Sequence, residues 1–339
     1  MPETTTGTRS LHSVDEVAAM IESGAGLVLA GEEAVLSRLP RGNWIGGTIP
    51  YFMTAEAGGA VDHTRIFVQP LPDGASVAWQ GLLDREALPE FAASGPDNGY
   101  TLMLLPSQSD VHRDFALNGP TWPGVFRRPL AGWVTGVFLD RLGIDSPKVF
   151  DGASGTLSGD SAVIMHVALP DDAYARVEIV NLFEQDNGPA LTFGDGGDPT
   201  GFTVEWVHVG GVRTRLADHI ASRGIDTRLP LVADYNGAMV NVAIAGIDQN
   251  TGQVTFFAPV VPGMTYRFAR PIDDYEREFA RRIADASGDV AFSCNCILNF
   301  TYAGLEGKHT GAFAVPMSFG EIAYMLLTQT LVYLTIERD

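Results

Sequence analysis

Lysine is nearly missing from this sequence of 339 residues: it occurs as Lys148 and Lys308, and arginine supplies the rest of the 22 basic side chains. The sequence also has 41 acidic side chains, so its formal net charge is −19. A field of this sign repels phosphate backbones and anionic membranes, so we expect neither nucleic acid nor a membrane as a partner. The composition fits an acidic bacterial protein from a GC-rich genome and, equally, a protein from a salt-rich cytoplasm.

Cysteines and targeting segments are also scarce. Cys294 and Cys296 are the two cysteines, and neighbours this close on one strand seldom form a disulfide, which indicates a reducing compartment. Residues 1–16 have neither an apolar core nor a basic start, so we expect no signal peptide. The longest apolar run, residues 322–336, is interrupted by Thr328, Gln329 and Thr330 and is too short to span a bilayer. The sequence therefore predicts a cytoplasmic protein.

Motifs that would define a catalytic or metal site are absent from the sequence. It contains no G-x-S-x-G, P-loop or H-E-x-x-H pattern. Its histidines lack ligand spacing, and one C-x-C pair is half a zinc site at best. The Asp- and Gly-rich residues 194–201 have the composition of a calcium loop but not its order, so a linker is the better interpretation. We predict no metal and no cofactor.

What the sequence does have is a regular alternation of apolar and polar segments. The first ~130 residues alternate between helical and strand patterns, and hairpin patterns with DG, SG and GD turns follow. A chain of this length exceeds one compact core. We therefore predict an α/β (α+β) protein of two domains, residues 1–200 and 201–339, with mixed sheets flanked by helices and stacked across the domain seam.

Several predicted strands are apolar on both faces, which places them centrally in a sheet. The last of them, TLVYLTIE at 330–337, is expected to pair with VAFSCN at 290–295 near the middle of the C-terminal sheet. The strand WIGGTI at 44–49 carries Gly46 and Gly47, although glycine weakens a strand. Two explanations stay open: a concave ligand site walled by Trp44 and Tyr51, or a β-bulge or tight packing against a helix.

Two further residues have chemistry that needs an explanation. Glu321 follows Phe319-Gly320 in an apolar stretch, where a charge is costly unless it is paired or bonded to backbone amides. Cys294 ends an apolar strand and could serve as a nucleophile, provided that a base such as His309 or His63 lies within reach. An inert cysteine in the core of a strand is the competing interpretation.

Several C-terminal segments, taken in order, resemble one known family. They are the Gly210-Gly211 turn, Pro262-Gly263 after a hairpin, Ser293-Cys294, Gly320-Glu321-Ile322 and Gln329-Thr330-Leu331. This ordered set is similar to the FIST module, a bacterial sensory domain of signal-transduction proteins, and WIGGTI and PLAGWVTG extend the resemblance from about residue 13 to 336. The sequence departs from the family pattern at Asn295, Cys296 and Ile297 and at residues 314–318.

The resemblance implies a stand-alone sensory protein that binds a small polar metabolite such as an amino acid and signals to a protein partner. Alternatives are a cysteine-dependent enzyme or a haem-containing nitric-oxide sensor, so enzymatic activity stays open, and a non-enzymatic role is favoured. In the sensory hypothesis Glu321 pairs with a ligand ammonium and the glycine amides bind a carboxylate. The expected ligand-binding residues are Trp44, Gly46, Gly47, Thr48, Tyr51, Cys294, Asn295 and Glu321.

Overall fold

The computed structural model describes residues 10–194, 200–235, 237–283, 289–310 and 314–338. The chain combines mixed β-sheets with helices, which confirms the predicted α+β class. It divides into two compact units: unit 1 comprises residues 1–180, 279–326 and 331–339, and unit 2 comprises 181–278 and 327–330. Unit 2 is thus inserted into unit 1, instead of following a single boundary after residue 200. Most of the predicted linker, residues 195–199, lies outside the described residues.

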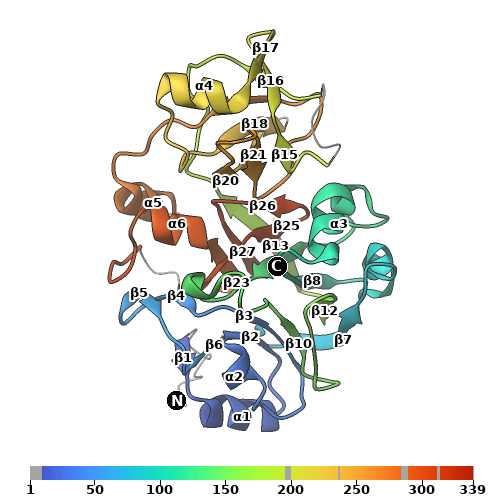
Figure 1. Ribbon diagram of the computed structural model, residues 1–339. Coiled ribbons are helices and arrows are strands. Elements are labelled where there is room, and N and C mark those ends of the chain that lie inside the picture. The colour runs from blue at the N-terminus through green and yellow to red at the C-terminus, as the bar shows by residue number, and fades with distance from the viewer. Residues whose placement is uncertain (1–9, 195–199, 236, 284–288, 311–313, 339) are drawn as a thin grey trace. The chain divides into compact units, whose positions relative to one another are not determined.

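The first sheet of unit 1 contains the first long apolar strands of the chain. The helix α1 (Val14–Glu22) starts at a capping box, in which the Ser13 hydroxyl accepts from the Glu16 amide and the Glu16 carboxylate accepts from the Ser13 amide. Together with α2 (Glu33–Leu36) it covers one face of this sheet (Figure 1). The strand order is β1 (Ser10–His12), β6 (Ile66–Pro70), β2 (Leu27–Gly31), β3 (Trp44–Thr48), β10 (Val149–Asp151) and β11 (Thr156–Ser158).

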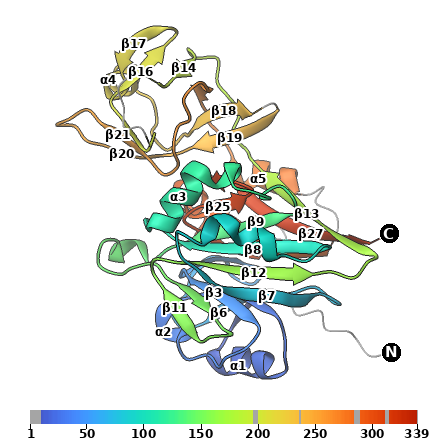
Figure 2. The ribbon, with the colours of Figure 1, turned by 90° about the vertical axis from the view of Figure 1, so that its right-hand side faces the viewer.

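The second sheet contains the parallel pair β8 and β9, and Figure 2 shows β8 beside β12 and β7. Its order is β26 (Leu326–Leu327), β25 (Glu321–Ala323), β9 (Leu130–Thr135), β8 (Gly99–Pro106), β12 (Ala162–Ala168) and β7 (Ser76–Leu83). The helix α3 (Asp110–Asn118) follows β8 directly. Short 3-10 helices complete this part: η1 (Leu88–Ser94), η2 (Gly119–Thr121) and η3 (Leu139–Arg141).

The third sheet confirms the predicted pairing of the last strand. β27 lies between β13 and β23, with Val332 opposite Cys294. The strand β23 extends one residue past the predicted segment 290–295 and leads directly into the helix α6 (Ile297–Tyr302). After the predicted strand at 44–49, the chain passes through Pro50 into β4, which belongs to a different sheet from β3. The order is β13 (Ala173–Val180), β27 (Leu331–Arg338), β23 (Asp289–Cys296), β24 (Val315–Ser318), β4 (Tyr51–Thr54) and β5 (Gly58–Val61).

Each of these three sheets contacts the other two. The Ser293 amide donates to Gln69 Oε1 at 2.9 Å, which joins the third sheet to the first. The Cys294 thiol donates to the Gly132 carbonyl oxygen at 3.3 Å, which joins the third sheet to the second. Gly47 of the first sheet packs on the ring of Trp133 of the second. The core of unit 1 is therefore built where strands of all three sheets meet.

Unit 2 has its own core, centred on residues such as Leu231 and Tyr266. The hairpin expected before Pro262-Gly263 is confirmed as β20 and β21, which are joined by the turn QNTG at 249–252. One sheet has the order β17 (Val212–Arg215), β16 (Trp206–Val209), β14 (Leu191–Thr192), β22 (Thr265–Phe268), β18 (Leu231–Tyr235) and β19 (Ala238–Val242), and the other β15 (Thr203–Val204), β21 (Val254–Phe256) and β20 (Ile244–Ile247). The helices are α4 (Leu216–Arg223) and α5 (Tyr275–Ile283), which crosses the division between the units.

Candidate functional site

The eight residues expected to bind a ligand all lie in unit 1, so they do not line a seam between the two halves of the chain. Beside the glycines there is no concave space. A Cβ atom on Gly47 would lie 2.5 Å from the Thr135 methyl and 2.7 Å from the Trp133 ring. Trp44 is buried against Phe150, with ring centroids 6.3 Å apart. Close packing explains both glycines: Gly47 packs on strand β9 of the second sheet, and Gly46 packs on Trp44 and Leu29 of its own sheet, so neither glycine packs on a helix.

The C-terminal members of the predicted site form a buried polar cluster. Cys294 and Glu321 are both 0% exposed. The Ser318 hydroxyl contacts both the Glu321 carboxylate, at 3.1 Å, and the Asn295 carbonyl oxygen, at 3.2 Å. Burial, together with the nearby Glu321 charge, raises the pKa of the Cys294 thiol well above its usual value. A thiol that is protonated and shielded from solvent is poorly suited to nucleophilic attack.

Thr48 and Tyr51 have a different role, because both hold the loop 136–148 in place. The Lys148 amide donates to Thr48 Oγ1 at 2.9 Å, and the Leu139 amide donates to the Tyr51 hydroxyl at 3.0 Å. The Tyr51 ring also stacks on Phe138 at a centroid distance of 6.0 Å. These contacts fix both ends of a loop that forms one wall of a pocket.

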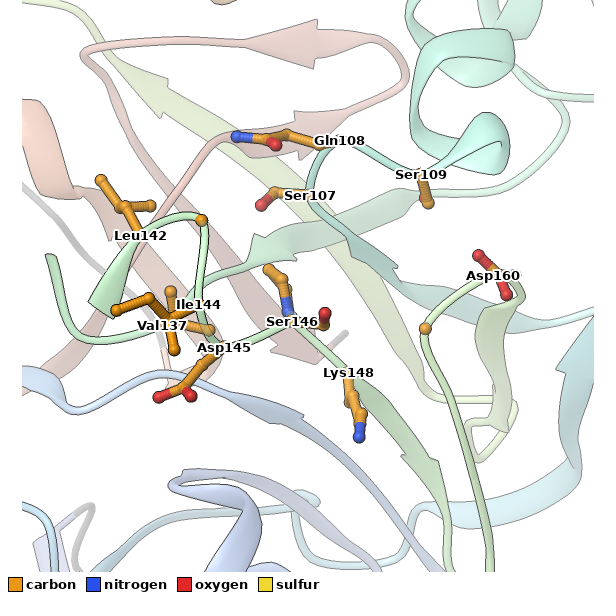
Figure 3. A pocket seen from close by; sticks show the side chains of 13 residues that line it. Ser107, Gln108, Ser109, Val137, Leu142, Ile144, Asp145, Ser146, Lys148 and Asp160 are labelled. Carbon is orange, nitrogen blue, oxygen red and sulfur yellow. The ribbon is translucent and has the colours of Figure 1, made fainter.

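That pocket, which we call the strand-end pocket, has a volume of about 490 Å³ (Figure 3). It lies where the parallel strands β8 and β9 end, which is the edge of an α/β sheet where ligands usually bind. A smaller pocket of about 50 Å³ adjoins it and includes Thr48. The strand-end pocket is lined by Ser107, Gln108, Ser109, Val137, Leu142, Gly143, Ile144, Asp145, Ser146, Pro147, Lys148, Gly159 and Asp160.

The upper wall of the pocket is a tight turn from β8 into α3. Gln108 has a left-handed backbone with φ of 63°, a conformation that is uncommon outside glycine and costs stability. Its amide donates to His112 Nδ1 at 3.3 Å, and the Ser109 hydroxyl caps α3 by accepting from the His112 amide. Burial lowers the pKa of His112 to about 4, so its ring is neutral and can accept this hydrogen bond.

The opposite wall is held by two ion pairs. Arg141 makes two hydrogen bonds to the Asp145 carboxylate, at 3.0 and 2.8 Å, and these hydrogen bonds lower the pKa of Asp145. Lys148 points its ammonium group to Glu33, at 3.0 Å. The two charged loop residues that line the pocket, Asp145 and Lys148, are therefore both ion-paired with neighbours, and the loop also presents hydroxyl and aliphatic groups to the pocket.

Polar groups without protein partners remain inside the pocket. In the described part of the chain, the Ser107 and Ser146 hydroxyls, the side-chain amide of Gln108 and the Asp160 carboxylate have no side-chain partner. Polar groups beside aliphatic walls, in a volume of a few hundred Å³, are typical of small-molecule sites. Within the described ranges, no group of three or more His, Cys, Asp and Glu residues has the arrangement of a metal site. No helix there has the length and apolar character needed to cross a membrane.

None of the residues that line this pocket was predicted from the sequence as a site residue. The available signal was the segment 99–110, where an apolar strand ends in Ser107-Gln108-Ser109 and leads directly into a helix. A strand of that kind ends at the edge where ligands bind. The contribution of Asp160 had no such signal, because it depends on how the turn after β11 reaches the pocket.

The fold and the pocket together define an α+β protein with a small-molecule-sized pocket at the ends of parallel strands. Residues 12–337 match a family of unknown function, DUF6976, and the chain belongs to that family. No curated protein and no solved structure is significantly similar to it.

Proposed function

We propose that this protein is a small-molecule-binding sensory protein, related in role to FIST modules, and that it binds a small polar metabolite in the strand-end pocket. The observation that carries the proposal is the set of unpartnered polar groups that line a pocket of about 490 Å³. The ordered C-terminal motifs, among them Gly320-Glu321-Ile322, support a sensory role by resemblance. The binding event is proposed to reach a protein partner in a reducing compartment such as the cytoplasm.

The pocket proposed here replaces the one expected around Gly47 and Cys294. Those residues lie in the packed core, and the predicted ligand contact of Glu321 is taken by Ser318. The cysteine-dependent enzyme has no support in the geometry, since the Cys294 thiol is buried and hydrogen-bonded to the Gly132 carbonyl. Thr48 and Tyr51 retain an indirect role, because they position the loop that closes one side of the pocket.

A thermal-shift screen of metabolites tests the proposal, since a ligand that binds the native state raises its melting temperature. Ser146 lines the pocket and is exposed, so Ser146→Trp fills the pocket without disturbing the core. Ser76→Trp on the exposed edge strand β7 is the matched control. We expect at least one metabolite to raise the melting temperature of the wild type and of Ser76→Trp but not that of Ser146→Trp. A broad library without a hit, or a hit that stabilises Ser146→Trp equally, would count against the proposal.

A further inference from the structure

The third sheet of unit 1 ends in a long and regular strand. Among the described residues, β13 is the outermost strand on one side of this sheet, beside β27 (Figure 2), and its eight residues pair without a shift in register. The outermost strands β1, β11, β26 and β5 have two to four residues, and β7 pairs with its neighbour through an irregular register. β13 also contains neither proline nor lysine, which commonly protect a sheet edge. This edge can therefore accept a further strand.

The backbone of β13 presents hydrogen-bonding groups to this outer edge. The Ala173 amide donates to the Pro170 carbonyl oxygen at 3.0 Å, and the Ala173 carbonyl oxygen accepts from the Asn98 side chain at 3.0 Å. Both backbone groups of Ala173 therefore point away from β27. In an antiparallel pair this direction alternates from one residue to the next. The residues that also point their amides and carbonyls outward are Ala175, Val177 and Ile179.

The side chains along this edge are charged on one face of the sheet and apolar on the other. Arg176 and Glu178 share one face, where Arg176 Nε lies 2.6 Å from Glu178 Oε1, and the two side chains are 62% and 35% exposed. Val177 and Ile179 share the opposite face, and Ile179 is 44% exposed. Removing an exposed isoleucine from water is favourable. The edge therefore favours a partner strand that is itself charged on one face and apolar on the other.

A second copy of β13 is such a strand, and the charges select one register for it. When two copies pair antiparallel around a two-fold axis, the residue at the axis pairs with itself. An axis at Arg176 or Glu178 places like charges opposite each other, which is destabilising. An axis at Val177 instead places Arg176 opposite Glu178 of the second copy, and Tyr174 opposite its Val180. Opposite charges and aromatic–β-branched pairs both stabilise antiparallel strands.

We propose that this protein forms a homodimer in which two copies of β13 pair antiparallel around a two-fold axis at Val177, so that the two third sheets become one. Val177 then bonds to its own copy through both backbone groups, and the pairs of Ala175 with Ile179 add further backbone bonds. On the charged face, Arg176 and Glu178 of the two copies alternate in sign around the axis. The inference is independent of ligand binding in the strand-end pocket.

The dimer is expected to be weak. One pair of edge strands makes a small interface, and a net charge of −19 on each copy opposes association. We therefore expect a dissociation constant in the micromolar range, measured at physiological ionic strength, where the Debye length is about 8 Å.

Sedimentation equilibrium of the full chain tests the dimer and its register. Arg176→Glu and Glu178→Arg each place like charges opposite each other at two positions, and we expect either change to weaken the dimer about tenfold or more. The double variant Arg176→Glu/Glu178→Arg restores the opposite charges and is expected to dimerise like the wild type. Arg38→Glu, at an exposed residue outside β13, is the matched control for net charge and should also dimerise like the wild type. A thermal melt of each variant checks that the monomer is folded.

Crosslinking at the axis is an independent test of the register. The Cα atoms of the two copies of Val177 are expected about 5.5 Å apart, within the range of a disulfide. Mild oxidation of Val177→Cys should therefore give a covalent dimer. Ile179→Cys is the matched control, because its two copies are separated by four residues along the strand, or about 13 Å. The native Cys294 and Cys296 are both buried.

Several results would overturn the inference. They are a wild-type chain that stays monomeric throughout the micromolar range, a double variant that is folded but does not regain dimerisation, an equal loss in Arg38→Glu and Arg176→Glu, and equal crosslinking of Val177→Cys and Ile179→Cys. The proposed function is tested separately by the metabolite screen, so failure of the dimer leaves it standing.

Discussion

Gly47 occupies a position where one added methyl group has no room. The ideal Cβ position lies within 2.7 Å of both the Thr135 methyl and the Trp133 ring, and both side chains are 0% exposed. Overpacking a core in this way forces side chains away from their preferred rotamers. The contact between the first and second sheets therefore requires a glycine at position 47. The low strand propensity of glycine is offset by that contact.

We expect Gly47→Ala to lower the free energy of unfolding by about 1–3 kcal/mol, measured by urea denaturation. Gly246→Ala is the matched control, since no atom lies within 4 Å of its Cβ position and its backbone is not left-handed. If Gly47→Ala were as stable as Gly246→Ala, the close packing of β3 on β9 would be disproved.

His166 is the second residue whose environment leads to a measurable effect. It is fully buried; its Nε2 donates to the Phe91 carbonyl oxygen at 3.0 Å, and its Nδ1 accepts from the Thr101 hydroxyl at 2.9 Å. Burial lowers its pKa from 6.5 to about 4. The unfolded chain therefore binds a proton at a higher pH than the folded protein does.

The stability that depends on neutral His166 is present above pH 6.5 and is lost as the pH falls from 6.5 toward 4. Neutral His166 contributes roughly 2–3 kcal/mol to the free energy of unfolding at neutral pH. We expect His166→Gln to be less stable than wild type at pH 7 and to lose less further stability between pH 7 and pH 4.5. His309 is exposed, so His309→Gln is the control, and we expect its stability to change with pH as that of the wild type does. If the stabilities of His166→Gln and wild type changed with pH in parallel, this pH dependence would not come from His166.

At the level of elements, β27 holds the third sheet together. It pairs with β13 on one side and with β23 on the other, and its residues from Leu331 to Ile336 are buried. Its removal leaves two strand edges unpaired and takes several large side chains out of the core. Each of those side chains contributes about 2–5 kcal/mol, against a total stability of roughly 5–15 kcal/mol.

We expect a chain that ends after Thr330 to yield no soluble protein. A chain that ends after Glu337 is the control, because it retains the buried part of β27, and we expect it to be soluble. The measurements are the soluble fraction after expression and, for any soluble product, a thermal melt. Cooperative melting of the shorter chain would show that β27 is dispensable.

Elements with a strong local signal could be predicted from the sequence, whereas their grouping could not. The capped helix after Ser13 and the doubly apolar strand β27 follow from residue types and their spacing alone. The division of 44–54 between two sheets depends on Pro50 and on partners distant in sequence. The packing role of Gly47 could not be predicted for the same reason. A glycine that packs on a neighbouring sheet and a glycine that contacts a ligand have the same sequence pattern, and only the position of Trp133 separates the two cases.

For the whole molecule, the excess of acidic side chains is the dominant property. Self-repulsion of a net charge of −19 destabilises the compact state, and salt screens it over a Debye length of about 10 Å at 0.1 M. We expect the melting temperature at pH 7 to rise from low to roughly molar NaCl. The increase should be much smaller near pH 5, close to the isoelectric point of about 4.6. A salt effect of equal size at both pH values would point away from charge repulsion.

The insertion of unit 2 also determines the order in which the protein is completed during synthesis. The chain leaves unit 1 at Val180 and returns to it at Phe279, so β23, β24, β25 and β27 emerge from the ribosome after nearly all of unit 2. At about 5–20 residues per second, the ~60 residues from Phe279 to Arg338 take roughly 3–12 seconds. During that interval β13 waits for its partner β27, while nearly all of unit 2 has been made and can fold. The nascent chain therefore exposes apolar strands for seconds, and this makes it a natural client for chaperones that bind at the ribosome exit.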